Sequence, residues 1–322
     1  MAEEEQNQPP KRIGCEDDDE DRISQLPDCL LAEILSRLPS TKDAIRTGAL
    51  SKRWKHLWTC VPILVFQHPC DSCLYGRPLD FFSYVDKTLT QRPHLKVNKF
   101  TLSCFYDDRV KSQVHNWIRY AVDCNVEDLY LWLYRMGRLR RFQLDQFFFI
   151  NSCFTHLTLK HCAFNPTGAI SWKNLRKLCI AYGKLDEDLI ENILSGSPVL
   201  ETLVLDYCNG YRQLNITSKS VKNLVLHHWQ YDIIEINAPN ILTLKVQYAS
   251  DILLLNVSSL VEAHLFRFGT TTDEAQEEML TGFILNLLHV KDLKIGTSCV
   301  KVLDRLKAKG FICPSNLKVL DS

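Results

Sequence analysis

Residues 200–208 read Leu-Glu-Thr-Leu-Val-Leu-Asp-Tyr-Cys, with apolar side chains at Leu200, Leu203 and Leu205. In an extended strand alternate side chains point to the same face, so Leu203 and Leu205 should face one side together. The same pattern, apolar-x-x-apolar-x-apolar, occurs nine times between residues 97 and 295. Repetition of one short strand pattern predicts a fold in which similar units stack along one axis. The nine copies begin at Val97, Val126, Phe154, Leu175, Leu200, Val221, Ile241, Leu260 and Val290.

The spacing of these copies is typical of leucine-rich repeats. Their middle residues are separated by 29, 28, 21, 25, 21, 20, 19 and 30 residues, which is the leucine-rich repeat period with irregular insertions. We therefore expect a solenoid over residues 96–322 whose short strands form one parallel β-sheet. Residues 186–200 predict a helix that ends at Gly196, whereas other connections are short and partly extended, so the convex side should be mixed. Cys162 and Cys208 follow their strands at a position where small buried side chains are expected.

The outward positions of the predicted strands mix aromatic and charged side chains. Nine strands about 4.8 Å apart make a sheet roughly 40 Å wide, which suits the binding of another protein. Trp132 and Trp229 are the strongest candidates for contacts with a target, because exposed tryptophans often anchor interfaces. Taken singly, each outward residue is more often simply solvated. The outward residues include Tyr130, Trp132, Lys160, Asp206, His227, Trp229 and Lys245.

Two further zones precede the repeats. Residues 1–21 hold nine acidic side chains against Lys11 and Arg12, a net charge of minus seven, and lack the apolar residues that a core needs. We expect a disordered acidic leader there. Residues 22–62 carry a net charge of plus four and predict three short helices. We expect residues 63–95 to be a linker or an N-terminal cap of the solenoid.

The helical zone has recognisable ends and one apolar stripe. Pro27 suits a helix start, and Pro39 ends the stripe that runs from residue 30 to residue 38. Ser40 with Asp43 predicts a capping box that opens the second helix. Two tryptophans lie in the third helix. Three helices of only two or three turns should not bury all of these apolar side chains against one another. The apolar surface left exposed predicts a protein partner.

The stretch from residue 26 to residue 58, LPDCLLAEILSRLPSTKDAIRTGALSKRWKHLW, closely resembles the F-box of plant F-box proteins with leucine-rich repeats. The Leu-Pro pair, the ILSRLP helix end and the LSKRWKHLW close occur together at the family spacing. Cys29, where relatives are often acidic, and Gly48, inside the second helix, depart from the pattern without touching the apolar stripe. In that family the F-box docks on a Skp-type adaptor, which joins a cullin scaffold. The adaptor contacts that the resemblance implies are Leu26, Pro27, Leu31, Ile34, Leu35, Leu38, Pro39, Ile45, Leu50, Trp54, Leu57 and Trp58.

The resemblance implies an α/β chain with a short N-terminal three-helix F-box and a leucine-rich-repeat solenoid. Its implied function is that of a non-catalytic substrate-recognition subunit of an SCF-type ubiquitin ligase, whose repeat sheet binds a protein target. An alternative function is a non-degradative F-box scaffold or sequestration protein that binds the adaptor without promoting ubiquitination. The helical zone could also pack only on its own chain. The identity of the target, and whether a small molecule assists its recognition, stay open.

Composition disfavours several other classes of protein. The 38 basic residues balance 38 acidic ones, which argues against nucleic-acid binding, and no apolar run is long enough for a membrane span. Thirteen cysteines, an odd number, with no export signal before them, predict reduced thiols in the nucleus or cytoplasm. We expect no cofactor and no metal, because the pair Cys70 and Cys73, with His68 nearby, lacks a second ligand pair.

Two smaller sequence features are a basic cluster and a C-terminal repeat signature. Arg135, Arg138, Arg140 and Arg141 form a basic cluster that could contact a phosphate or an acidic degron, although such clusters are more often solvated loops. A last repeat signature begins at residue 317, and related plant proteins often continue into another C-terminal domain. We therefore expect either a form without that domain or a short terminal stub.

Overall fold

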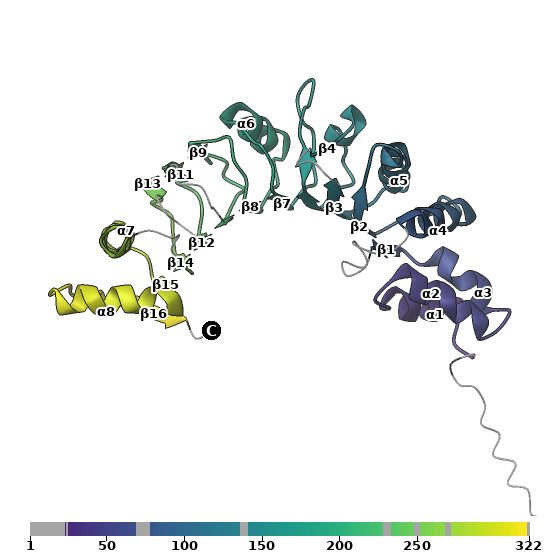
Figure 1. The fold of residues 1–322 in the computed structure, drawn as a ribbon, viewed down its shortest axis with the longest axis horizontal. Helices are drawn as coiled ribbons and strands as arrows, with labels where there is room; N and C mark the ends of the chain where they lie inside the picture. Colours follow the sequence, from purple (N-terminus) through teal and green to yellow (C-terminus); the bar gives the residue numbers. More distant parts are fainter. Residues whose placement is uncertain are drawn as a thin grey trace, which may run out of the picture.

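The protein, seen in a computed structural model, is an arc of strands with a group of helices at its N-terminal end (Figure 1). The structure describes residues 23, 25–68, 78–135, 141–227, 233–247, 252–267 and 272–320. The acidic leader, Trp229 and the pair Cys70 and Cys73 lie outside the described residues, so the expectations about them stay predictions. No helix in the described ranges is long and apolar enough to cross a membrane.

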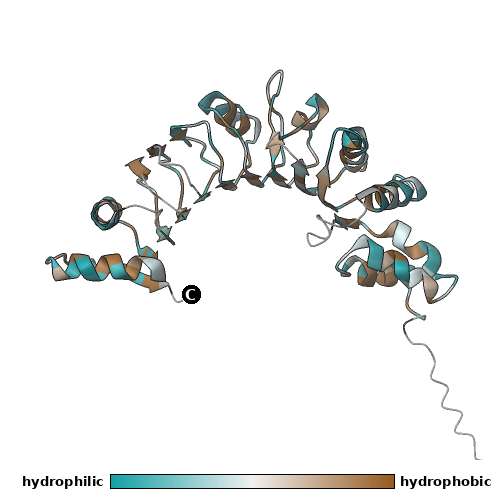
Figure 2. Cartoon of the chain, viewed as in Figure 1, coloured by the Kyte–Doolittle hydropathy of each residue, from teal (hydrophilic) through white to brown (hydrophobic). Residues whose placement is uncertain are grey.

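The N-terminal helices form a small unit with its own core. The Ser40 hydroxyl accepts a hydrogen bond from the Asp43 N–H at 3.2 Å, which confirms the predicted cap of the second helix. Figure 2 shows hydrophobic and hydrophilic residues mixed along these short helices. The helices are α1 (Asp28–Ser36), α2 (Thr41–Arg46), η1 (Thr47–Ala49), α3 (Trp54–Leu57) and η2 (Trp58–Cys60).

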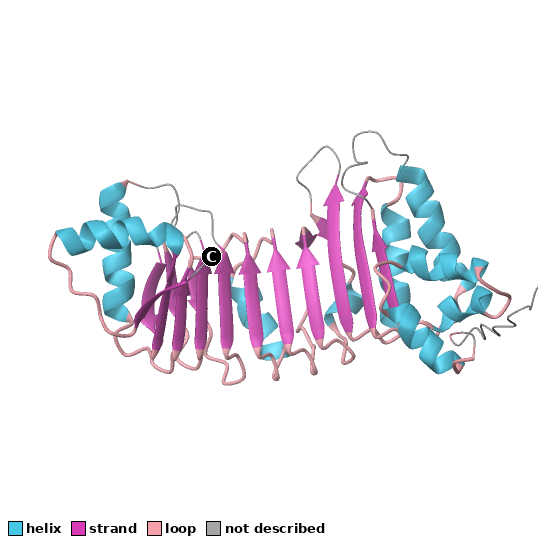
Figure 3. Cartoon of the chain, turned by 90° about the horizontal axis from the view of Figure 1, so that it is seen from below, coloured by secondary structure: helices cyan, strands magenta, loops and turns pink. Residues whose placement is uncertain are grey.

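Eleven parallel strands form the main sheet, and they lie side by side along the arc (Figure 3). All nine predicted repeat strands are present. β1, which continues the sheet at its N-terminal edge, falls in the region predicted as a linker or cap. In sheet order the strands are β1 (Ile63–Gln67), β2 (Lys99–Tyr106), β3 (Asp128–Arg135), β5 (His156–Lys160), β7 (Lys177–Ala181), β8 (Thr202–Asp206), β10 (Asn223–His227), β12 (Thr243–Gln247), β14 (Glu262–Leu265), β15 (Asp292–Gly296) and β16 (Leu317–Leu320).

Register places the repeat leucines directly beside one another. Leu203 pairs with Leu178 on one side and with Leu224 on the other, and all three side chains are buried. The residues between them, such as Val204, are half-buried on the opposite, concave face. The buried leucines therefore form continuous rows along the solenoid, which is the packing expected of repeat proteins.

The convex side is mixed, as predicted. The expected helix is α6 (Glu187–Gly196), and the Asp186 side chain caps it by accepting from the Leu189 N–H at 2.9 Å. In other repeats a short strand takes the place of a helix, and three of these strands, β9 (Gln213–Asn215), β11 (Ile234–Asn237) and β13 (Ile252–Asn256), pair in a second sheet. The remaining elements are α4 (Pro78–Gln91), β4 (Phe142–Gln143), α5 (Lys111–Asp123), η4 (Gln146–Phe149), β6 (Cys162–Ala163), α7 (Asp273–Asn286), η5 (Thr297–Cys299) and α8 (Val300–Ala308).

The cysteines after the strands are buried, as predicted. Cys208 Sγ lies 3.2 Å from the Ile180 carbonyl oxygen, and Cys162 Sγ lies 3.6 Å from the Lys160 carbonyl oxygen. Burial raises the pKa of the Cys208 thiol to about 12 and raises that of Cys162 as well. Both thiols therefore stay protonated and unreactive at neutral pH. Every cysteine in the described ranges is a free thiol.

The helical unit is attached directly to the first strands of the sheet. The Val65 N–H donates to Thr41 Oγ1 at 2.7 Å. The guanidinium of Arg92, only 3% exposed, donates to the Val61 carbonyl oxygen at 3.1 Å and to the Tyr120 hydroxyl at 3.1 Å. Buried, charge-assisted hydrogen bonds of this kind hold their partners firmly. The helical unit is therefore fixed relative to the solenoid.

Replacing Leu224 with alanine should lower the free energy of unfolding by about 2–5 kcal/mol, because truncation leaves a cavity between packed repeats. Urea unfolding followed by circular dichroism measures the change. Val225→Ala, one residue along but on the half-buried concave face, should cost about 1 kcal/mol or less. Equal losses in the two variants would contradict the inward and outward assignment.

Candidate functional site

Burial divides the twelve predicted adaptor contacts into two groups. Five of them are at most 6% exposed and pack against one another inside the helical unit. Both tryptophans of the third helical segment are core residues of this unit, so the apolar surface that it leaves exposed lies at other positions. In this chain the buried side chains hold the helices together rather than face solvent, and any contact of theirs with an adaptor stays a prediction. The five are Leu31, Leu35, Trp54, Leu57 and Trp58.

The other predicted contacts lie at or near the surface. Ile34 is 44% exposed and Leu50 is 70% exposed. Leu30, which the motif comparison omitted, is 49% exposed and lies one turn from Ile34 on the same face of α1. These three side chains are apolar surface that the helical core does not use. The remaining predicted contacts are the half-buried Leu26, Leu38 and Ile45 and the exposed Pro27 and Pro39.

Hydrogen bonds from Arg53, which we call the Arg53 latch, hold the residues before α1 against the start of α3. Arg53 donates to Asp28 Oδ1 from Nε at 2.8 Å and from Nη2 at 2.6 Å, and it also donates to the Leu26 carbonyl oxygen. The latch connects residues more than twenty positions apart. The Leu26–Pro27 pair and the start of α1 are thereby kept beside the start of α3.

The concave face carries a row of aromatic rings across five neighbouring strands, β2, β3, β5, β7 and β8, at their C-terminal ends. The predicted contact Trp132 belongs to this row: it lies on β3, half-buried, with its ring centroid 4.9 Å from that of Tyr134. We call six residues the aromatic ladder: Phe105, Trp132, Tyr134, His161, Tyr182 and Tyr207.

The rings of the ladder stack from strand to strand. The Phe105 and Tyr134 centroids are 4.9 Å apart, and those of Tyr134 and His161 are 4.7 Å apart. His161 and Tyr182 are nearly parallel, at 4.3 Å and 4°. Tyr182 and Tyr207 follow at 5.4 Å and 21°. Each contact is worth about 0.5–1.5 kcal/mol beyond the burial of its area.

Three members of the ladder have an unusual backbone. His161, Tyr182 and Tyr207 are each the first residue after a strand, and their φ angles are 60°, 56° and 51°. The left-handed region costs an ordinary side chain about 1–2 kcal/mol, and glycine avoids that cost. Three successive repeats therefore hold a large ring where a glycine would be free of strain.

Two cations flank the ladder. The Lys160 ammonium lies 4.9 Å from the Trp132 ring centroid and 5.6 Å from that of Tyr130. Arg141, the one residue of the predicted basic cluster with a described side chain, donates from Nε to the Tyr182 carbonyl oxygen. Burial lowers the pKa of His161, and the charges of Arg141 and Lys160 lower it further. His161 is therefore neutral at pH 7.

The sequence contains a signal for the ladder. His161, Tyr182 and Tyr207 each stand two positions after the second apolar residue of a strand. His228 and Tyr248 stand at the same position in the next two repeats, but both lie outside the described residues. Aligned by repeat, these five aromatic residues occupy one position and would have indicated a shared role at the strand ends.

A histidine and an aspartate predicted at outward positions of the strands lie together at the β8 end of the ladder. His227 Nδ1 lies 2.9 Å from Asp206 Oδ1, an ion pair at the end of the ladder when the histidine is protonated. Within the described ranges, no group of three or more His, Cys, Asp or Glu side chains could hold a metal ion.

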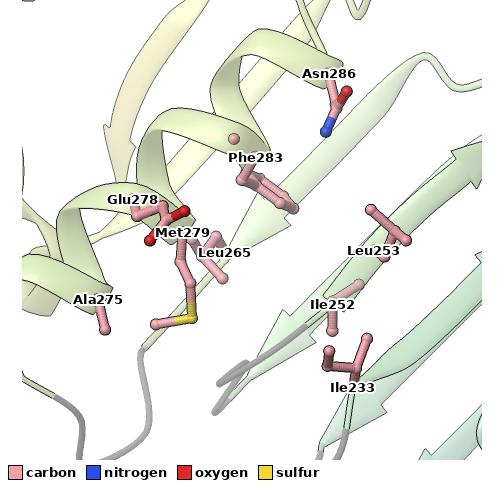
Figure 4. Close-up of a pocket in the computed structure, with 10 residues that line it drawn as sticks. Ile233, Ile252, Leu253, Leu265, Ala275, Glu278, Met279, Phe283 and Asn286 are labelled. Carbon is pink, nitrogen blue, oxygen red and sulfur yellow. The ribbon is translucent and has the colours of Figure 1, made fainter.

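A separate apolar cavity of about 380 Å³ lies on the convex side, where α7 faces strands β11 and β13 (Figure 4). Met279 and Phe283 of α7 line it opposite Ile252 and Leu253. It is on the other face of the sheet from the ladder, and Leu253 in its wall is 44% exposed. Leu253 therefore provides a control for substitutions of exposed apolar residues in the helical unit.

Family models match both the helical unit and the solenoid. The F-box domain model matches residues 23–66. The model described as the At1g61320/AtMIF1 LRR domain matches residues 89–317, more than half of the chain. No solved structure matches the chain.

Full-length comparison gives similar proteins from Arabidopsis thaliana. The chain is 34% identical over 308 residues to the putative F-box protein At1g49610, covering 92% of this chain and 75% of that protein. It is 33% identical to the F-box protein At5g03100, covering 91% and 94%. It is also 33% identical to the F-box/LRR-repeat protein At5g02910, covering 93% of this chain but only 65% of that protein. The three-helix unit, the parallel solenoid and these matches agree: the chain belongs to the F-box proteins with leucine-rich repeats.

Proposed function

We propose that the chain is a non-catalytic substrate receptor of an SCF-type ubiquitin ligase, in the nucleus or cytoplasm. In this role the F-box docks on a Skp-type adaptor, and through it on a cullin scaffold, while the repeat sheet binds a protein target. The observation that carries the proposal is the apolar surface left on a completed helical core, at Leu30, Ile34 and Leu50. Exposed apolar residues of this kind favour a protein partner.

The size of that surface indicates how the adaptor would be held. Fully burying such a side chain contributes about 1.5–3 kcal/mol, so covering the exposed part of three of them contributes roughly 2–5 kcal/mol in total. Association costs offset much of this. Additional contacts, from the half-buried Leu26 and Leu38 and the exposed Pro27 and Pro39, are therefore needed for a stable complex.

The rigid connection between the two parts supports a scaffolding role. Arg92 and Thr41 tie the F-box to the first strands, so a target on the concave face would sit at a fixed place relative to a docked adaptor. Holding reactants in one geometry accelerates their reaction without chemistry from the scaffold. The receptor would then act by position alone.

The double variant Ile34→Asp, Leu50→Asp should lose adaptor binding, because two charges replace the exposed apolar surface. We expect the Skp-type adaptor retained in a pull-down to fall by at least about tenfold. Leu253→Asp is the matched control, since Leu253 has the same 44% exposure as Ile34 but lies on the convex face of the solenoid. Undiminished capture by the double variant, with its fold intact by circular dichroism, would refute adaptor docking.

A second measurement separates a degradative receptor from a sequestering one. With the proteasome inhibited, proteins captured from cells by the wild-type chain should carry ubiquitin. The same proteins captured by the Ile34→Asp, Leu50→Asp variant should be unmodified, because the concave face is intact but the ligase is absent. Targets that lack ubiquitin in both captures would instead favour the non-degradative scaffold.

A further inference from the structure

We propose that the aromatic ladder, with Lys160 and Arg141, binds an extended segment of the target that carries an anionic side chain, either a carboxylate or a phosphate. The inference rests on the proposed function, because it names the chemistry of the target that the repeat sheet would hold. It also restricts recognition to one half of the concave face, on strands β2 to β8.

Backbone strain is the first observation. His161, Tyr182 and Tyr207 keep a left-handed φ in three successive repeats, where glycine would relieve the strain. Strained conformations that the surrounding structure maintains concentrate at binding and catalytic sites. Ring stacking offsets part of the free-energy cost of the left-handed φ. It does not explain why aromatic residues occupy these positions at the strand ends, where Tyr182 is 37% exposed.

The charge distribution is the second observation. Neither Lys160 nor Arg141 forms an ion pair with a carboxylate in the described part of the chain. At the other end of the same face, Lys294 lies 2.5 Å from Glu262 and is neutralised by it. Lys160 and Arg141 are therefore unpaired cations beside the ladder, whereas the carboxylate at its β8 end, Asp206, lies 2.9 Å from His227. An anionic partner complements such cations.

The third observation is an unsatisfied donor in the ladder. Trp132 Nε1 is covered from solvent and has no hydrogen-bond acceptor among the described residues. A buried donor without an acceptor destabilises the protein by about the cost of a lost hydrogen bond. The Lys160 ammonium lies over the face of the same ring, 4.9 Å from its centroid, so the unsatisfied donor and the unpaired cation belong to one part of the ladder.

The dimensions suit a short extended peptide. Five strands about 4.8 Å apart span about 19 Å, which equals roughly six residues at the rise of an extended chain. Such a segment could contact stacked ring edges along its length, with one acidic or phosphorylated residue near Lys160 and Arg141. Aromatic side chains and Arg are enriched in protein interfaces of this kind.

Synthetic peptide arrays test the inference directly. The probes are fifteen-residue peptides with a shared background of Leu, Pro, Ser and Tyr and a central Glu, phosphoserine, Ala or Lys. The full chain is co-purified with its Skp-type adaptor and applied to the array. We expect retention on Glu or phosphoserine peptides at least about tenfold above that on Lys peptides. The Glu and phosphoserine arms show which anion is preferred.

Three variants locate the binding on the ladder. Lys160→Glu should abolish the anionic preference, and Lys160→Met, which keeps the packing of the stem, should weaken it. Tyr182→Gly removes a ring and two stacking contacts, so it should reduce retention, while relief of the left-handed backbone offsets the lost stacking and should keep the change in melting temperature small. Lys245→Glu makes the same charge change on β12 of the same face and should retain wild-type binding.

Several outcomes would overturn the inference. These are equal retention of Glu, phosphoserine, Ala and Lys peptides, retention of none of them, or the same loss in Lys160→Glu and Lys245→Glu. Adaptor co-purification is measured in every sample. If it persists while the peptide preference is absent, the ladder proposal fails and the adaptor proposal stands; if the adaptor is lost from the wild-type chain, the proposed function fails instead.

Discussion

The solenoid and its concave face depend on the register of neighbouring parallel strands. Leu203 lies beside Leu178 and Leu224, so the apolar rows continue from one repeat to the next, and the concave face is fixed by the same pairing. Because strand side chains alternate with a period of two, a slip of one residue would bring the leucines to the concave face and bury the ladder. The positions of Lys160 and Trp132 next to each other follow from this register, since the two residues are paired partners in β5 and β3.

The repeat period made most of the fold predictable. It did not predict which side chains of the short N-terminal helices are buried in their core. The nine strands were predicted because one spacing recurs. β1 was missed although Val61, Leu64 and Phe66 have the same spacing, because that region was assigned to a linker or cap. In helices of two turns or fewer, periodicity does not separate an inward face from an outward one. The motif includes the buried Trp54 and Trp58 among the adaptor contacts and leaves out Leu30, which belongs to the apolar stripe and is exposed.

The ladder shows a different limit of sequence reasoning. Trp132 was identified as an exposed anchor on its own, without the rings that stack around it. A left-handed φ at Tyr182 or Tyr207 has no residue-type signature, because glycine and asparagine are the residues that usually mark it. Only the column of rings, compared across repeats, would have indicated the feature. Residues that break a local rule in several repeats are more informative about binding than residues that obey it.

The position of the ladder along the arc connects it with the F-box. The ladder begins on β2, which pairs with β1, and β1 is bound to the F-box through Val65 and Thr41. The solenoid bends between adjacent repeats, and small rotations accumulate along its length. A segment held on β2 to β8 would therefore be separated from a docked adaptor by fewer repeat interfaces than one held on β14 or β15. The unpaired cations Lys160 and Arg141 lie on this half of the sheet, so under the proposed function a bound segment would sit at the end of the scaffold whose position relative to the F-box is better defined.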